Sequence, residues 1–204
     1  MRLTEAVHNW LRPRLRPGDR VLDATAGGGR DTLALARAVA PGGRVFALDI
    51  QAAALEQTRE RLFTEAPEVT LTLAGRSHGD LAAALPAAAR GRLAAAVFNL
   101  GYLPGSPDGP ATTPETTRNA LDAAWQWLCP GGGLSVMAYP GHAGGRDELE
   151  AVTRWMAGLE APSERVAGPG ADAPIWFHAR RPLADGRLVA DNPGEPAAFS
   201  DAVT

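Results

Sequence analysis

The chain is 204 residues long and contains no lysine, so all 20 of its Lys-plus-Arg side chains are arginines. A contact with a phosphate must therefore come from an arginine fork or from backbone N–H groups. The formal net charge is −3 at pH 7. This balance argues against strong nonspecific binding to nucleic acid, but it allows a local basic patch.

Cysteine, long apolar runs and metal-binding clusters are also scarce. The single cysteine, Cys129, excludes an internal disulfide framework and fits a reducing cytoplasm. No apolar run approaches the ~20 residues of a membrane span. The N-terminal segment contains Glu5 and no long apolar stretch, so we expect no signal peptide. No His/Cys cluster has metal-ligand spacing and no Gly-x-Ser-x-Gly turn is present, so no metal is expected.

What the sequence does contain is a strand, a glycine turn and a helix in immediate succession. Residues 20–24 form a short apolar run, Gly27 to Gly29 follow, and residues 30–40 have helical periodicity. This order is typical of a nucleotide-binding α/β unit. Glycine lets a ligand approach the backbone, and the helix N-terminus offers free N–H groups to an anionic part of it.

The acids beside this turn indicate which ligand is bound. Thr32 stands where a dinucleotide motif has its third glycine, and Asp23 would repel a pyrophosphate. Asp23 suits a positively charged ligand such as S-adenosylmethionine. Asp49 ends the next apolar run, where an acid can accept both ribose hydroxyls. The alternative is a plain tight turn in which Asp23 and Asp49 only cap strands.

The rest of the chain alternates strands with helices, which predicts an α/β fold with a mostly parallel sheet and helices on both faces. Further strands are expected at 44–49, 69–73, 93–99, 134–139, 165–167 and 175–179, the last two as an antiparallel pair. Helices are expected at 4–15, 52–65, 80–89, 114–128 and 147–159. We predict one domain over 1–182 and a polar, loosely ordered tail over 183–204. The segments 23–29, 49, 78, 99–105 and 139–145 would share the carboxyl edge of the sheet.

A second motif, Asn99-Leu-Gly-Tyr102, follows the fourth strand. It resembles the Asn/Asp-Pro-Pro-Tyr/Phe signature of methyltransferases that modify amino groups, with Leu100 and Gly101 in place of the prolines. In that arrangement the Asn oxygen accepts hydrogen bonds from the amine and the ring stacks on the target group. The alternative is that Asn99 caps the strand and Tyr102 packs the loop.

Two other loops contain histidines. Tyr139 and His142 could help to keep an alkyl amine uncharged, because such an amine has a reference pKa near ~10. The alternative for His142 is that it only lines a substrate entrance. His78, in the loop after the third strand, either contacts a base or is simply solvated.

The series DATAGGGRDT, ALDIQ, SHGDL, FNLGYLPG, TTPETT, LCPGGG and YPGHAGG resembles one bacterial family over about residues 4–181. That family was long labelled as ribosomal RNA methylases and is now associated with methylation of 5-aminomethyl-2-thiouridine at the tRNA wobble position. The resemblance implies a seven-stranded, Rossmann-like class I methyltransferase fold with S-adenosylmethionine as donor. It implies donor contacts at Asp23, Thr25, Gly27, Gly29, Asp31, Thr32, Asp49, Gln51, Ser77, His78 and Asn99. It places the substrate at Asn99, Gly101, Tyr102, Thr116, Tyr139 and His142, with Asn99, Tyr102 and His142 as catalytic residues.

The resemblance also implies binding of the tRNA anticodon stem-loop, for which Arg12, Arg14, Arg118 and Arg146 are candidates. A homodimer is a further expectation. The rival hypotheses are methylation of ribosomal RNA or of a small amine, a nucleotide-dependent oxidoreductase, and a module that holds the donor without catalysis.

Overall fold

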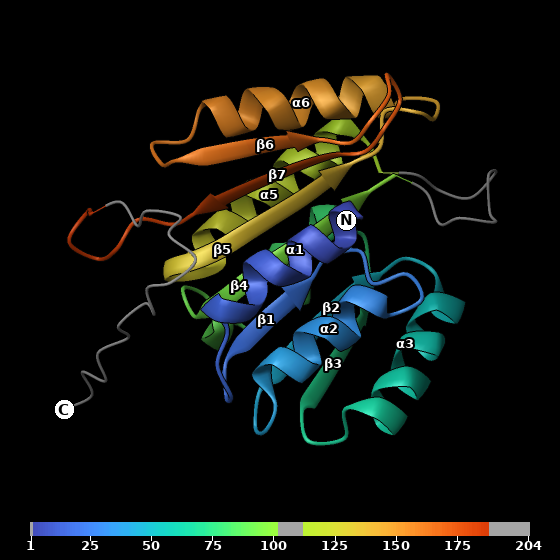
Figure 1. Cartoon of the computed structure of the whole chain (residues 1–204). Helices are drawn as coiled ribbons and strands as arrows, with labels where there is room; N and C mark the ends of the chain where they lie inside the picture. The colour runs from blue at the N-terminus through green and yellow to red at the C-terminus, as the bar shows by residue number, and fades with distance from the viewer. Residues whose placement is uncertain (1, 102–111, 188–204) are drawn as a thin grey trace.

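The structure is a computed structural model that describes residues 2–101 and 112–187 (Figure 1). Its strands form one seven-stranded sheet in the order β3-β2-β1-β4-β5-β7-β6. The first five strands in that order run parallel, and β7 pairs antiparallel with both β5 and β6. The strands are β1 (Arg20–Asp23), β2 (Arg44–Asp49), β3 (Thr70–Gly75), β4 (Leu93–Leu100), β5 (Leu128–Ala138), β6 (Ser163–Ala167) and β7 (Ile175–Arg180). The predicted fold class is confirmed.

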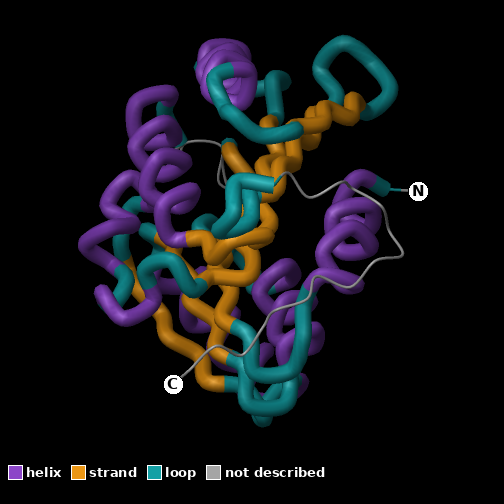
Figure 2. Tube along the Cα trace, turned by 90° about the vertical axis from the view of Figure 1, so that its left-hand side faces the viewer, coloured by secondary structure: helices purple, strands orange, loops and turns teal. Residues whose placement is uncertain are grey.

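Helices cover both faces of this sheet (Figure 2). The α-helices are α1 (Leu3–Leu11), α2 (Arg30–Val39), α3 (Ala52–Glu65), α4 (Leu81–Ala84), α5 (Pro114–Trp127) and α6 (Gly145–Ala157). Three short 3₁₀ turns are η1 (Arg12–Arg14), η2 (His78–Asp80) and η3 (Ala87–Ala89).

Alternation along the strands divides the apolar side chains between two cores. On β1, Val21 packs in the core beneath α1, α2 and α3, whereas Leu22 packs in the core beneath α4, α5 and α6. Val45 and Phe46 on β2 divide in the same way. Both faces of a parallel sheet are thus buried, which is why its strands are nearly continuous apolar runs.

Three predicted elements differ in the structure by more than two residues. The helix expected over 4–15 ends at Leu11 and is followed by η1, which contains Pro13. The helix expected over 80–89 is interrupted, because Leu85 is extended before Pro86 and a proline cannot continue a helical hydrogen-bond ladder. The strand expected over 134–139 instead begins at Leu128 and contains a bulge, where Leu128 pairs with Leu93 and Gly133 pairs with Ala95. Gly131 permits it with φ of 78°.

Other expectations lie partly outside the described residues. The tail predicted over 183–204 is described only to residue 187, where Leu183 and Arg187 close a turn through a 2.9 Å backbone hydrogen bond. Within 2–101 and 112–187, no helix has the length and apolar character to cross a membrane.

Candidate active site

A pocket of about 600 Å³ opens at the carboxyl ends of the parallel strands. We call it the cleft. It is lined by Thr4, Ala24, Thr25, Ala26, Gly27, Gly28, Arg30, Asp31, Asp49, Ile50, Gln51, Gln57, Arg61, Arg76, Ser77, His78, Asn99, Gly101, Thr112, Thr116 and Tyr139. The glycine turn, Asn99 near the end of β4 and Gly101 just after it therefore line the same space, as the sequence predicted.

The glycine turn is clamped between β2 and α3. The Gly27 N–H donates to Asp49 Oδ2 at 2.8 Å, and the Gly27 carbonyl accepts from Thr58 Oγ1 at 3.1 Å. Gly29 is the N-cap of α2 with φ of 74°, and a Cβ there would lie 2.8 Å from Thr58 Oγ1. Glycine at 29 is therefore required both by its backbone conformation and by the close approach of α3.

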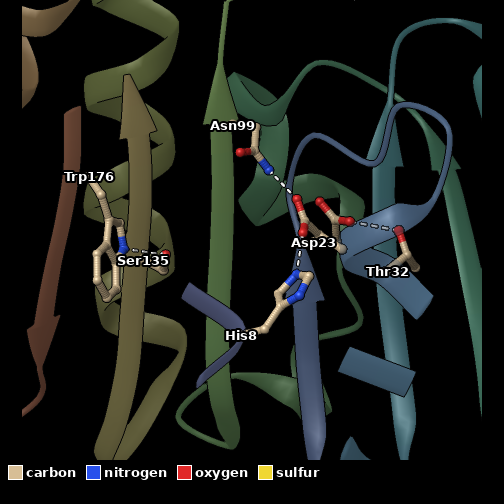
Figure 3. A network of polar contacts seen from close by, with 7 residues as sticks. His8, Asp23, Thr32, Asn99, Ser135 and Trp176 are labelled. Carbon is tan, nitrogen blue, oxygen red and sulfur yellow. Dashed lines mark hydrogen bonds and ion pairs between the residues drawn. The ribbon is translucent and has the colours of Figure 1, made fainter. Parts of the chain in front are cut away.

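Asp23 and Thr32 lie beneath this turn and do not line the cleft. Both are 0% exposed, and Thr32 Oγ1 donates to Asp23 Oδ2 at 2.6 Å (Figure 3). The Thr25 N–H donates to the other Asp23 oxygen at 3.2 Å. The sequence expectation of direct donor contact at Asp23 and Thr32 is thus corrected: their bonds brace the loop that forms the cleft wall.

Burial raises the pKa of Asp23 from its ordinary value of 3.8 to about 7. The nearby carboxylate of Asp31 raises the pKa further, while the Thr32 hydroxyl and the Thr25 N–H oppose the rise. A cation entering the cleft above Asp23 would favour its ionised form.

Asp49 lies at the end of β2, on the cleft wall, and its carboxylate holds the glycine turn through a hydrogen bond. Its Oδ1 accepts from the Gln51 N–H and its Oδ2 from the Gly27 N–H, each at 2.8 Å. A carboxylate has about four lone-pair directions, so each oxygen can still accept a ribose hydroxyl. Ile50, 48% exposed beside it, adds an apolar surface that the sequence analysis missed, although it directly follows the predicted acid.

Ser77 and His78 close the cleft beyond β3. Ser77 Oγ accepts from the Gly79 N–H at 3.1 Å and so caps η2. His78 is only 7% exposed, with its ring edge-on to Phe98, so the interpretation of a solvated histidine is wrong. Burial lowers the pKa of His78 to about 4. The ring is therefore neutral near pH 7, so one ring nitrogen can donate a hydrogen bond to an uncharged base and the other can accept one.

Asn99 presents its side chain to the cleft in a fixed orientation. Its N–H donates to Thr25 Oγ1 at 2.7 Å, and its Nδ2 donates to Asp31 Oδ2 at 2.6 Å. Because a carboxylate only accepts, this bond assigns the nitrogen to the Asp31 side and leaves the carbonyl oxygen Oδ1 on the other (Figure 3). The arrangement suits an acceptor for an amine N–H.

His8 is a site residue that the sequence analysis missed. Its Nε2 lies 2.5 Å from Asp31 Oδ1, so that Asp31 joins His8 to Asn99 (Figure 3). His8 stands beside the predicted buried face of the first helix, next to Val7, which was its only signal. Its partner is 23 residues further along the chain.

The remaining substrate candidates divide into three groups. Gly101, Thr116 and Tyr139 line the cleft, and burial raises the pKa of the Tyr139 hydroxyl. Tyr102 lies outside the described residues. His142 is not among the lining residues; its Nδ1 bonds to the Ala143 carbonyl at 2.9 Å.

That bond defines the His142 tautomer. A carbonyl only accepts, so Nδ1 bears the proton and Nε2 has the lone pair in the neutral ring. Nε2 would lie 3.3 Å from a Cβ placed on Gly101. His142 therefore lies directly beside Gly101, and its role as a proton acceptor stays a prediction.

A buried acid, Glu148, binds Thr112, which is the first described residue after 101. The sequence analysis also missed this acid. It is 1% exposed and accepts from Thr112 Oγ1 at 2.6 Å and from Thr117 Oγ1 at 2.5 Å. Burial raises the pKa of Glu148. The Thr112 N–H donates to the Gly101 carbonyl at 3.1 Å, so Glu148 holds the two described ends of the loop together through Thr112.

Two of the four proposed RNA-binding arginines have other partners. Arg14 lies over the Trp10 ring at 4.6 Å and bonds to the Trp10 carbonyl. Arg146 pairs with Asp172 at 2.8 Å. Arg12 and Arg118 are exposed. No group of three or more His, Cys, Asp or Glu residues in the described parts of the chain could hold a metal ion.

Comparison with known proteins yields a family and several relatives. A family model described as "Putative rRNA methylase" matches residues 45–168. A chloroplastic protein of Arabidopsis thaliana named tRNA (mnm(5)s(2)U34)-methyltransferase is 40% identical over 164 residues, which cover 76% of this chain and 59% of the relative. The chain thus spans about three fifths of that relative's length.

Solved structures agree with this fold. A structure from Clostridium thermocellum described as a "putative rRNA-methylase" has a TM-score of 0.78 and 32% identity, covering 87% of this chain and 96% of its own. A methyltransferase of Streptococcus mutans in complex with SAH has a TM-score of 0.74 and 28% identity, covering 88% of this chain and 98% of its own.

Proposed function

Because this chain belongs to the family described as "Putative rRNA methylase", we propose that it is an S-adenosylmethionine-dependent N-methyltransferase acting on tRNA. The proposed reaction converts 5-aminomethyl-2-thiouridine to 5-methylaminomethyl-2-thiouridine at the wobble position. The observation that supports it best is the Asn99 amide, whose carbonyl oxygen is directed away from Asp31 at the cleft. The name of the Arabidopsis relative supports the choice of nucleoside.

The cleft fits the proposed donor. We assign Asp49 and Gln51 to the ribose, Ile50 and His78 to the adenine, and the turn at Gly27 to the amino-acid part, because all of them line the cleft. When bound, S-adenosylmethionine supplies an activated methyl group on a cationic sulfonium. The SAH complex of the Streptococcus relative supports this choice over a nicotinamide nucleotide.

At the other end of the cleft, the residues must hold an uncharged amine in line with the methyl group. Asn99 Oδ1 would accept an amine N–H and so direct the nitrogen lone pair toward the donor side of the cleft. The amine must first lose its proton, since its reference pKa is about 10. His142 Nε2, behind Gly101, is the proposed acceptor of that proton, and Tyr102 the proposed stacking partner of the base.

The partner proposed for this site is the anticodon stem-loop of a tRNA in the cytoplasm. Arg12 and Arg118 are the exposed arginines of the original four without an acidic partner among the described residues. We also propose that the protein forms a homodimer.

The test is a methylation assay with purified protein, labelled donor and tRNA that bears 5-aminomethyl-2-thiouridine. We expect label in that nucleoside, and a loss of at least 100-fold in rate for Asn99→Ala. Label found only in ribosomal RNA or in a free amine would replace the substrate and keep the chemistry. Donor binding without transfer to any of these acceptors would favour a non-catalytic module.

A further inference from the structure

A chain of short contacts runs from α1 through α2 to the acceptor end of the cleft. His8 Nε2 lies 2.5 Å from Asp31 Oδ1, and Asp31 Oδ2 lies 2.6 Å from Asn99 Nδ2 (Figure 3). The two oxygens of one carboxylate thus hold two different partners. The Asp31 side chain is 18% exposed, whereas that of His8 is 36% exposed.

This division fixes a torsion that Asn99 alone cannot fix. A carboxylate held at one oxygen can rotate about its Cβ–Cγ bond, because that terminal torsion is broad. A second bond, at Oδ1, removes this freedom and defines where Oδ2 lies. Since Oδ2 orients the Asn99 amide, the His8 contact also determines where the amide oxygen points.

His8 is itself placed by the docking of α1. Trp10, on the same helix, lies edge-on to Trp176 at 6.1 Å between ring centroids, and it lies 4.7 Å from His178. Thr4, one turn before His8, lines the cleft. The first helix is therefore part of the active site and not only a cover for the sheet.

We propose that His8 is a positioning residue for methyl transfer, acting through Asp31 on the Asn99 amide. This inference rests on the proposed function. His8 touches neither donor nor acceptor in this account. Its removal should therefore lower kcat and leave donor binding and KM for RNA nearly unchanged.

The decisive comparison is between His8→Phe and His8→Gln. Phenylalanine keeps the ring volume but cannot donate to Asp31, whereas the glutamine amide nitrogen reaches a position near that of histidine Nε2 and can donate. We expect kcat to fall about 10- to 100-fold in His8→Phe, because misplacement of a reacting group has effects of this size. His8→Gln should recover to within about threefold of the original protein.

Two further measurements separate the outcomes. Combining His8→Phe with Asn99→Ala should give no loss beyond that of Asn99→Ala alone, since both act on one amide. Equal kcat in His8→Phe and the original protein would overturn the inference, as would an equal loss in His8→Gln. An inactive original protein that still binds SAH would instead contradict the proposed function.

A separate observation concerns three arginines on the donor side of the cleft. Arg30 begins α2, Arg61 lies on α3 and Arg76 follows β3, and all three line the cleft. Within residues 2–101 and 112–187, no acid pairs with any of them. By contrast, Arg59 on the same helix as Arg61 is paired with Glu56 at 2.5 Å.

The charges of the proposed ligands indicate which anionic groups these arginines contact. The proposed donor has a single carboxylate, which one guanidinium can satisfy, and Arg30 at the helix start is the nearest to the glycine turn in sequence. Two unpaired cations then remain beside the cleft in a chain of net charge −3. We infer that Arg61 and Arg76 contact phosphates of the RNA substrate, where a guanidinium fork fits phosphate oxygens.

The test is binding of an anticodon stem-loop RNA at several salt concentrations. The double variant Arg61→Gln/Arg76→Gln should bind at least about 10-fold more weakly, with a salt slope smaller by about 1–2, because each lost phosphate contact removes ~0.7–0.9 from it. Arg59→Gln is the matched control and should change affinity less than about twofold. Unchanged RNA affinity in the double variant, or weaker SAH binding in its place, would overturn this assignment. Failure of the original protein to bind RNA would contradict the proposed function instead.

Discussion

At the scale of single residues, the site depends on carboxylates that face in defined directions. Asp23 is buried beneath the glycine turn, Asp49 stands at the cleft, and Asp31 lies between His8 and Asn99. Burial costs Asp23 free energy when it ionises, but its bonds to Thr32 and Thr25 hold the turn. We therefore propose that the three acids serve a cationic donor in different ways.

Asn99→Ala is expected to remove turnover while sparing the donor. The variant loses the proposed amine acceptor but keeps the backbone N–H that donates to Thr25. We expect kcat to fall about 100-fold or more, with the Kd for SAH within about threefold of the original value. Steady-state kinetics and calorimetric titration measure the two quantities. Unchanged kcat would remove Asn99 from the proposed mechanism.

Asp23→Asn should change stability in a pH-dependent way. The unfolded chain loses the Asp23 proton near its ordinary pKa of 3.8, whereas the folded chain keeps it until about pH 7. The folded state thus binds the extra proton between these values, and its stability falls as the pH rises through them.

The asparagine variant lacks this dependence. Its free energy of unfolding, relative to the original protein, should rise between pH 4 and pH 7 and level off above, by on the order of 4 kcal/mol at about 1.4 kcal/mol per pKa unit. Denaturant titrations at pH 5 and pH 8 measure the difference. A difference that is constant with pH would mean that Asp23 is ionised in the folded state throughout.

At the scale of elements, the glycine turn acts as a joint between three segments. Gly27 is bonded to β2 through Asp49 and to α3 through Thr58, and Gly29 is the N-cap of α2 against the Thr58 backbone. Movement of α3 would therefore open the donor end of the cleft. The short distance between α2 and α3 at this point depends on the absence of a side chain at 29.

Gly29→Ala should separate these helices, and Gly42→Ala is its matched control. Both glycines have positive φ, at 74° and 78°, but only at Gly29 would a Cβ meet other atoms, with the Thr58 Cα at 2.9 Å. Strain alone costs about 1–2 kcal/mol, and the clash adds about 1–3 kcal/mol. Thermal unfolding and SAH titration should show the larger loss, together with weakened SAH binding, for Gly29→Ala only. Equal losses in the two variants would mean that α3 yields without cost.

At the scale of the whole molecule, different strands of the sheet contribute residues to different parts of the cleft. Residues that follow β1, β2 and β3 line the part of the cleft where we propose that the donor binds, and Asn99, Gly101 and Thr116 line the part where we propose that the acceptor binds. The two helical layers hold opposite faces of the same sheet (Figure 2). A ligand that spans the cleft therefore stabilises the molecule as a unit.

SAH should raise the melting temperature, and a nicotinamide nucleotide should not. A ligand at 100 times its Kd adds about 2.7 kcal/mol to the stability of the folded state, which corresponds to ~5–10 °C for a domain of this size. Thermal scans with SAH, with NAD and without ligand measure the shifts. A shift with NAD of the same size would restore the oxidoreductase hypothesis.

Much of the fold could be predicted from the sequence, because local signals agree with the tertiary structure. The strand at Arg44–Asp49 and the helix at Ala52–Glu65 have the predicted bounds. The helix expected from residue 114 does begin at Pro114, and the Thr116 N–H donates to Thr113 Oγ1 at its N-cap. The β5 bulge was missed because a glycine run predicts a turn and does not reveal that the strand continues beyond it.

The sequence predicted which site residues follow each strand, but it did not predict which side chains contact one another. Asp49 and Asn99 were found because each ends an apolar run, and parallel strands bring such ends to one edge. The contacts of His8, Glu148 and Arg61 had no such signal. Each joins elements that are distant in sequence and whose relative rotation is set by packing.

Apolar periodicity and the ends of strands are local properties, so they predict a mostly parallel sheet covered by helices on both faces, with a glycine turn, an acid and an asparagine at one edge. Which polar side chains contact one another is set by the packing of separate elements. The packing of α1 brings His8 to Asp31, and the approach of α3 to α2 fixes the turn at Gly29. Such contacts depend on distances of a few tenths of an ångström between separate elements, which no pattern along one chain specifies.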